Sequence, residues 1–236
     1  MSANDDDELL GLVRDAAEPQ SLVLLDVPID GCDNLGGKHF RPIDKAIAHQ
    51  TLPALPASRA GGRGKRLKEL LEKNEKGLKV YEIYPYAIYK FLAYLKKRKL
   101  LQSLNSDRFD TLLDEGFRTY WPPKYKREKK REKRLENMSY LYSLLTDRDV
   151  GLNFRIPLNY PDASSNLSQL SDEYDASLGA IVGIYFANNS SYACVAGDSE
   201  SGEILLLADQ WLQAQLKKEV KVKKCGIGSK YHEISC

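Results

Sequence analysis

An uninterrupted apolar run, Leu22–Leu25, ends on the carboxylate of Asp26, and a proline follows at Pro28. Consecutive apolar residues without polar alternation are typical of a strand buried on both faces, and proline ends the strand because it cannot donate to the ladder. The pattern therefore predicts a buried strand that places Asp26 at the edge of a sheet.

A second stretch, residues 78–85, repeats this design with β-branched and aromatic residues, one acid at Glu82 and a closing Pro85. About fifty residues with helical patterning separate the two stretches, which is long enough for the crossover that joins parallel strands. We predict that the two strands are parallel neighbours. Asp26 and Glu82 would then lie roughly 5 to 8 Å apart at one sheet edge, where α/β sheets tend to place their sites.

Helical periodicity and turn residues predict most of the remaining elements. The acidic start of the chain, Asp5–Glu8, is most simply a helix cap, with a ligand cluster as the alternative. We expect a short helix after Pro42, a hairpin of strands 192–196 and 203–207, and helices over residues 5–17, 65–74, 86–99, 107–115, 124–145, 171–186 and 210–216.

The composition is that of an ordinary globular protein, with 42% hydrophobic and 29% charged residues. A length of 236 residues favours one domain, placed at 1–212, followed by a basic and flexible tail at 213–236. No apolar run approaches the roughly 18 residues of a membrane span, and the first residues do not resemble a secretory signal. The four cysteines fit no zinc spacing. We therefore expect a cytoplasmic protein that makes no membrane contact.

The basic residues are concentrated in one segment, although Lys and Arg (35) barely exceed Asp and Glu (33) overall. Eight of the eleven residues 124–134 are Lys or Arg. Such a run is usually the solvated face of a helix. Here Tyr120, Trp121 and Tyr125 add stacking surfaces beside it, which favours contact with nucleic acid, DNA or RNA. The candidate phosphate contacts are Lys126, Arg127, Lys130 and Arg131.

Asp172 and Asp175 stand three residues apart near the start of a predicted helix, so both carboxylates lie on one helix face. Acids in the first helical turn complement the helix dipole, and this structural role is the simpler interpretation. A functional role competes with it once Asp26 and Glu82 are considered as companions.

Five short motifs follow one another along the chain: Leu25–Pro28, Arg41–Asp44, Tyr81–Pro85, Asp172–Ala176 and Gly197–Ile204. Their order and spacing resemble an uncharacterised family of predicted nucleases with an RNase H-like fold, from about residue 21 to residue 207. The resemblance implies an α/β fold with a mixed sheet flanked by helices and a C-terminal β-hairpin.

The resemblance also implies carboxylates gathered at one end of the sheet to hold divalent metal. The matching positions are Asp26, Glu82, Asp172 and Asp175, with Asp44 as an additional position. Hard oxygen ligands suit Mg²⁺ or Mn²⁺, and two such ions can activate a water and stabilise the leaving oxygen in phosphodiester cleavage.

The chain departs from the family pattern at its start. The pattern begins with a strand that carries the first catalytic aspartate and continues with two antiparallel strands, whereas this chain starts at the helix that follows them. We expect these three strands to be absent unless the coding frame upstream of Met1 supplies them. Their absence would expose the edge of Leu22–Leu25, which a second copy of the chain or the C-terminal hairpin would have to cover.

Three functions are compatible with the sequence. The leading one is a metal-dependent nuclease. The second is a catalytically inactive nucleic-acid-binding protein on the same fold. The third is a partner-binding protein whose acids only cap helices and end strands.

Overall fold

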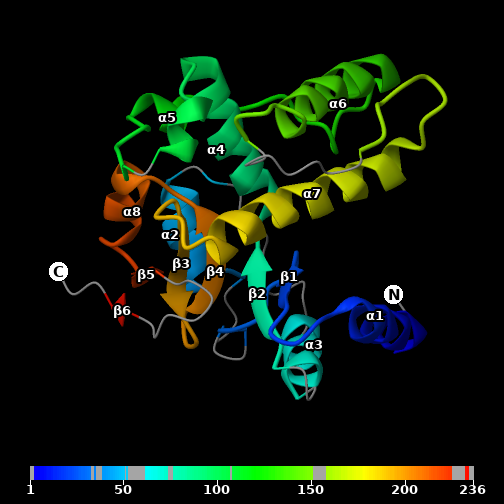
Figure 1. Cartoon of the computed structure of the whole chain (residues 1–236), viewed down its shortest axis with the longest axis vertical. Coiled ribbons are helices and arrows are strands. Elements are labelled where there is room, and N and C mark those ends of the chain that lie inside the picture. The colour runs from blue at the N-terminus through cyan, green and yellow to red at the C-terminus, as the bar shows by residue number, and fades with distance from the viewer. Residues whose placement is uncertain are drawn as a thin grey trace.

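The computed structural model describes residues 3–32, 35, 39–50, 52, 62–73, 77–106, 108–150, 158–224 and 232–233 (Figure 1). The elements in chain order are α1 (Ala3–Ala16), β1 (Leu22–Leu25), α2 (Pro42–His49), α3 (Arg63–Glu72), β2 (Lys79–Ile83), α4 (Pro85–Arg98), the 3-10 helix η2 (Leu101–Asn105), α5 (Gly116–Thr119), α6 (Arg131–Leu145), α7 (Leu167–Ala187), β3 (Ala193–Asp198), β4 (Gly202–Leu207), α8 (Gln210–Leu216), β5 (Val222–Lys224) and β6 (His232–Glu233).

The strands form one mixed sheet in the order β1-β2-β4-β3-β5-β6. β1, β2 and β4 run parallel, while β3 is antiparallel to both β4 and β5. The predicted parallel pairing of the first two strands is confirmed, with Leu25 opposite Glu82. The α/β class, the mixed sheet flanked by helices and the β3–β4 hairpin are confirmed as well.

Helices cover both faces of the sheet at the β1–β2 side (Figure 1). On one face, α7 packs so closely that a Cβ on Gly179 would lie 2.8 Å from a methyl carbon of Ile83, and one on Gly183 would lie 3.1 Å from Leu24. On the other face, α1 and α3 form a second apolar cluster with Val23 and Val80. Helices therefore lie against both faces of β1, as its continuous apolar run predicts, but its four residues are half-buried rather than buried.

The outer edge of β1 has no strand beside it in the described part of the chain. The hairpin that could have covered this edge pairs with the far side of β2 instead, because β4 lies parallel to β2. A second copy of the chain at the β1 edge stays a prediction.

The helices predicted over residues 124–145 and 107–115 differ from the structure. The basic segment is not the first half of a long helix, because α6 begins only at Arg131 and residues 124–130 cross the surface without helical structure. The predicted helix 107–115 is wrong over its described residues. The buried carboxylate of Asp209 instead accepts the backbone N–H groups of Leu112 and Leu113, both at 2.6 Å, and these bonds replace helical ones.

Helix α7 begins four residues earlier than predicted, because Asn166 rather than Ser171 caps it. The Asn166 side chain accepts the backbone N–H groups of Ser168 and Gln169. Asp172 and Asp175 consequently stand in the second turn and beyond, where the helix dipole gives them less stabilisation.

The domain boundary expected at residue 212 falls inside α8, and Val222–Lys224 of the expected tail pair with β3 as β5. Residues 225–231 and 234–236 lie outside the described part of the chain. Among the described helices, none is both long enough and apolar enough to span a bilayer.

Candidate functional site

The two strand-end acids lie on opposite faces of the sheet. Glu82 is the register partner of Leu25, so the next residue, Asp26, continues in register with Ile83. Side chains alternate between faces along a strand, and paired residues of parallel strands share a face. Asp26 therefore points to the α7 face with Ile83, whereas Glu82 points to the face that α3 covers.

Glu82 belongs to a fully buried ion-pair cluster. Its carboxylate accepts hydrogen bonds from Nη1 of Arg41 at 2.7 Å, from Nη2 of Arg41 at 2.5 Å and from the backbone N–H of Ile29 at 2.8 Å. The same guanidinium donates to Asp44 at 2.7 Å, and Tyr84 also donates to Asp44, at 3.0 Å. Arg41, Asp44 and Glu82 have fully buried side chains. Their hydrogen-bonding capacity is used within the protein, so the cluster serves the structure and leaves no carboxylate of it open to a metal.

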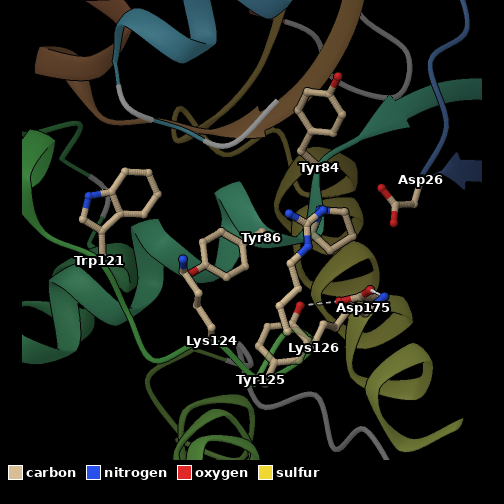
Figure 2. Close-up of a pocket in the computed structure, with 10 residues that line it drawn as sticks. Asp26, Tyr84, Tyr86, Trp121, Lys124, Tyr125, Lys126 and Asp175 are labelled. Atoms are coloured by element: carbon tan, nitrogen blue, oxygen red, sulfur yellow. Dashed lines mark hydrogen bonds and ion pairs between the residues drawn. The ribbon is translucent and has the colours of Figure 1, made fainter. Parts of the chain in front are cut away.

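A pocket of about 410 Å³ lies on the opposite face, between β1, α4, α7 and the segment before α6. Figure 2 shows Trp121 at one end of it and Asp26 at the other, with Tyr86 and Lys126 between them. The complete lining consists of aromatic, basic and acidic residues: Asp26, Tyr84, Pro85, Tyr86, Trp121, Lys124, Tyr125, Lys126, Arg127 and Asp175.

The acidic end of this pocket is held by α7. The Tyr125 hydroxyl donates to Asp175, and Lys126 forms ion pairs with Asp175 and, at 3.2 Å, with Asp172. Burial raises the pKa of Asp175, although Lys126 and Tyr125 oppose this shift. Of the four predicted acids, the structure therefore places Asp26 and Asp175 in the lining of one pocket, and Asp172 is paired with Lys126 of the same lining.

Asp26 differs from its neighbours because its carboxylate makes no hydrogen bond or ion pair with the described residues. Desolvation by the surrounding protein raises the pKa of Asp26 to about 6, with repulsion from Asp175 adding to the shift and Lys126 opposing it. The side chain still contacts solvent. It is thus an exposed carboxylate that no described residue bonds.

The residues at the acidic end do not fit the metal site that the family resemblance implies. Within the described ranges, no group of three or more His, Cys, Asp or Glu side chains is placed to hold an ion. Glu82 is committed to Arg41 on the far face of the sheet, and the Lys126 ammonium already occupies the space between Asp172 and Asp175. The positive charge of Lys126 repels a divalent cation, so binding of such an ion between these acids is unfavourable.

The other end of the pocket presents an exposed indole. Trp121 is 50% exposed, and the Nζ atom of Lys90 lies 4.3 Å from the centre of its ring. Burial lowers the pKa of Lys90 to about 8. The loop that carries Trp121 is fixed by two hydroxyls, because Tyr86 donates to the carbonyl of Pro122 and Tyr89 to that of Pro123, each at 3.1 Å. This stacking surface is therefore held in place before any ligand binds.

The four predicted phosphate contacts have different environments. Arg127 lines the pocket and, like Lys130, has an exposed side chain with no ion-pair partner among the described residues. Lys126 is held by two acids. Arg131 donates to the carbonyls of residues 163 and 165, at 2.8 and 3.0 Å, and so fixes the loop before α7. Arg127 and Lys130 are the two most open to an anion.

Sequence reasoning missed four pocket residues, Tyr84, Pro85, Tyr86 and Lys124. The Tyr-Pro-Tyr sequence directly after β2 was the available signal, because residues that follow parallel strands line the edge where sites form. Lys124 belongs to the basic run, but the helix predicted over this run gave no reason to place Lys124 in a pocket.

Comparison with known proteins assigns the chain to no family. No protein-family model matches the chain, and no curated protein or solved structure matches it significantly.

Proposed function

We propose that the pocket binds single-stranded nucleic acid without cleaving it. The observation that carries the proposal is that an exposed aromatic ring, Trp121, and two exposed cations, Lys124 and Arg127, line the same pocket. Base-on-aromatic stacking together with cations along the backbone is how proteins hold single strands.

A single strand suits this pocket better than a duplex. Bases that stack on a protein ring must first be free of their own partners. The pocket volume of about 410 Å³ lies in the range of small-ligand sites, so it accommodates a base or a nucleotide but not a double helix. A duplex could contact only the exposed lysines around it.

The metal-dependent nuclease is the second candidate. Its support is the presence of Asp26 and Asp175 in the pocket lining, with Asp172 paired to Lys126 beside them. The parallel β1–β2 pair with α7 against it supports an RNase H-like relationship of the fold. It ranks below binding because Glu82 is excluded from the site and because Lys126 is placed among the acids.

Fluorescence anisotropy with labelled single-stranded DNA, single-stranded RNA and duplex DNA tests the proposal. We expect the protein to bind single strands more tightly than duplex, with affinity that falls as salt is raised because phosphate contacts release counterions. Trp121→Ala should weaken binding roughly tenfold, since stacking contributes about 1–3 kcal/mol per base. Tyr160→Ala is the matched control, because Tyr160 is 60% exposed but lies outside the pocket lining.

The same mixtures, incubated with Mg²⁺ or Mn²⁺ and resolved by electrophoresis, separate the two candidates. Intact oligonucleotides under conditions of full binding support the binding protein. Metal-dependent cleavage that Asp26→Asn abolishes would favour the nuclease. Absence of both binding and cleavage would leave the third alternative, a partner-binding protein.

A further inference from the structure

The acidic end of the pocket contains an ammonium group, Lys126, and a carboxylate, Asp26, that has no partner among the described residues. Asp26 makes no hydrogen bond or ion pair with the described residues, and the charges near it are those of Asp175, Lys126 and Asp172. Asp175 is already bonded to Tyr125 and Lys126. Of the two acids that line the pocket, Asp26 is the one whose carboxylate has no partner among the described residues.

These groups define a hydrogen-bonding pattern. An ionised carboxylate only accepts, through two oxygens side by side, and a lysine ammonium only donates. The pocket end therefore offers two adjacent acceptors from Asp26 with a donor, Lys126, beside them. A ligand that matches this pattern carries two adjacent donors followed by an acceptor.

Guanine carries this pattern on its base-pairing edge, where the N2 amino group and N1–H are adjacent donors and O6 is the neighbouring acceptor. Adenine and cytosine each present one amino donor next to a ring acceptor. Thymine and uracil present one N–H between two carbonyl oxygens, which a carboxylate repels. Polar groups that become buried when a ligand binds discriminate among ligands, because a mismatch leaves one of them unpaired.

We propose that the acidic end of the pocket receives the base-pairing edge of an unpaired guanine, with Asp26 accepting from N1–H and N2–H and Lys126 donating to O6. This inference rests on the proposed binding of single strands and names the base that the pocket prefers. The aromatic side chains of Tyr86 and Tyr125 line the same pocket and supply apolar surface for the base, while Trp121 is at the end where a neighbouring base would stack.

Oligothymidylates that differ at one central position test the preference at mildly alkaline pH, where Asp26 is ionised. Anisotropy titrations compare thymine, adenine, guanine and hypoxanthine at that position. We expect guanine to bind about tenfold more tightly than thymine, the discrimination typical of a bidentate contact to a base. Hypoxanthine keeps N1–H and O6 but lacks the amino group, so it should fall between the two. The analogue 7-deazaguanine keeps the whole edge and should bind like guanine.

The variant Asp26→Asn identifies the residue responsible. An amide offers one acceptor and one donor, so the variant should lose the preference for guanine over thymine while its affinity for oligothymidylate stays the same or rises. Asp15→Asn, an exposed acid on α1, is the matched control and should keep the preference. Equal binding of all bases by the wild type, or an unchanged preference in Asp26→Asn, would overturn the inference and leave single-strand binding intact. Failure to bind any single strand would overturn both.

Discussion

The acids on the two faces of the sheet have similar sequence settings and opposite environments. Asp26 directly follows β1 and Glu82 is the last residue but one of β2, and a proline comes soon after each acid, at Pro28 and Pro85. Glu82 is fully buried and receives three hydrogen bonds from Arg41 and Ile29. Asp26 receives none from the described residues and lies at the end of an open pocket. The motif alone therefore does not determine the role of the acid.

One residue of offset in the register causes this difference. Leu25, not Asp26, is opposite Glu82, so the two carboxylates are sent to opposite faces. On the face that α3 covers, Glu82 meets the buried Arg41, and this ion pair is needed to keep the buried acid charged. On the face that α7 covers, Asp26 lies in a pocket with Lys126, which belongs to an exposed segment. The charges of Asp26 and Lys126 therefore stay accessible to a ligand.

Removing the buried acid should have the largest effect. Glu82→Gln leaves Arg41 buried with only one of its two carboxylate partners, and breaking a buried ion pair in this way costs about 3–5 kcal/mol. Urea denaturation should show this loss in the free energy of unfolding. Glu200→Gln, at an exposed carboxylate in the hairpin turn, should change it by less than about 0.5 kcal/mol. A loss of similar size in both variants would show that the cluster is not a structural ion pair.

Tyr125→Phe should have the next largest effect, because it removes a buried hydrogen bond to a charged group. The hydroxyl of Tyr125 donates to Asp175, and such bonds contribute about 2 kcal/mol. We expect the free energy of unfolding to fall by about that amount. Tyr160→Phe serves as the comparison, since Tyr160 is largely exposed. Equal stability of the two variants would contradict the described contact.

Lys126→Met should weaken oligonucleotide binding several-fold, because it removes a cation and leaves Asp172 and Asp175 without their ion pair. The slope of log affinity against log salt should fall by about 1 in magnitude if Lys126 contacts a phosphate, and less if it contacts a base. Lys45→Met, on the exposed surface of α2, should leave both quantities unchanged. If Lys126→Met and Lys45→Met weakened binding equally, binding would depend on the overall positive charge of the protein rather than on the pocket.

The smallest effect expected is that of Asp26→Asn on stability. The pKa of Asp26 is about 6 in the folded protein against an ordinary 3.8, so the folded state binds the proton more tightly. Wild-type stability should fall as pH rises through this window, and the variant should not show that part of the decrease. Because the Asp26 side chain is exposed, we expect the variant to gain less than about 1 kcal/mol of stability above pH 6. Unfolding curves of both proteins across this range, with Asp15→Asn as reference, measure the difference. If Asp26→Asn were less stable than the wild type, Asp26 would have to make a stabilising contact, which would contradict the description of its carboxylate as unpaired among the described residues.

The sequence predicts the framework well and the site only in part. Continuous apolar runs and proline stops located β1 and β2, because these signals are local. The spacing of Asp172 and Asp175 placed both on one helix face, and both contact Lys126. The opposite orientations of Asp26 and Glu82 depend on register between strands about fifty residues apart, which no local pattern encodes.

The structure of the segment 124–130 also depends on contacts that no local sequence pattern encodes. Its composition favours a solvated helix, but the buried Tyr125 is bonded to Asp175, and the Tyr125 carbonyl accepts from Nε of Arg134 at 2.9 Å. These tertiary contacts hold the segment across the pocket and override its helical propensity.

Hydrogen exchange with and without a saturating single-stranded oligonucleotide tests most directly which face of the sheet carries function. The account predicts slower exchange at Lys124–Arg127 and at Asp26, which border the pocket, and unchanged exchange at Ile43–Lys45 beside the buried cluster. Protection of the α2 side, with none at Lys124–Arg127, would contradict it.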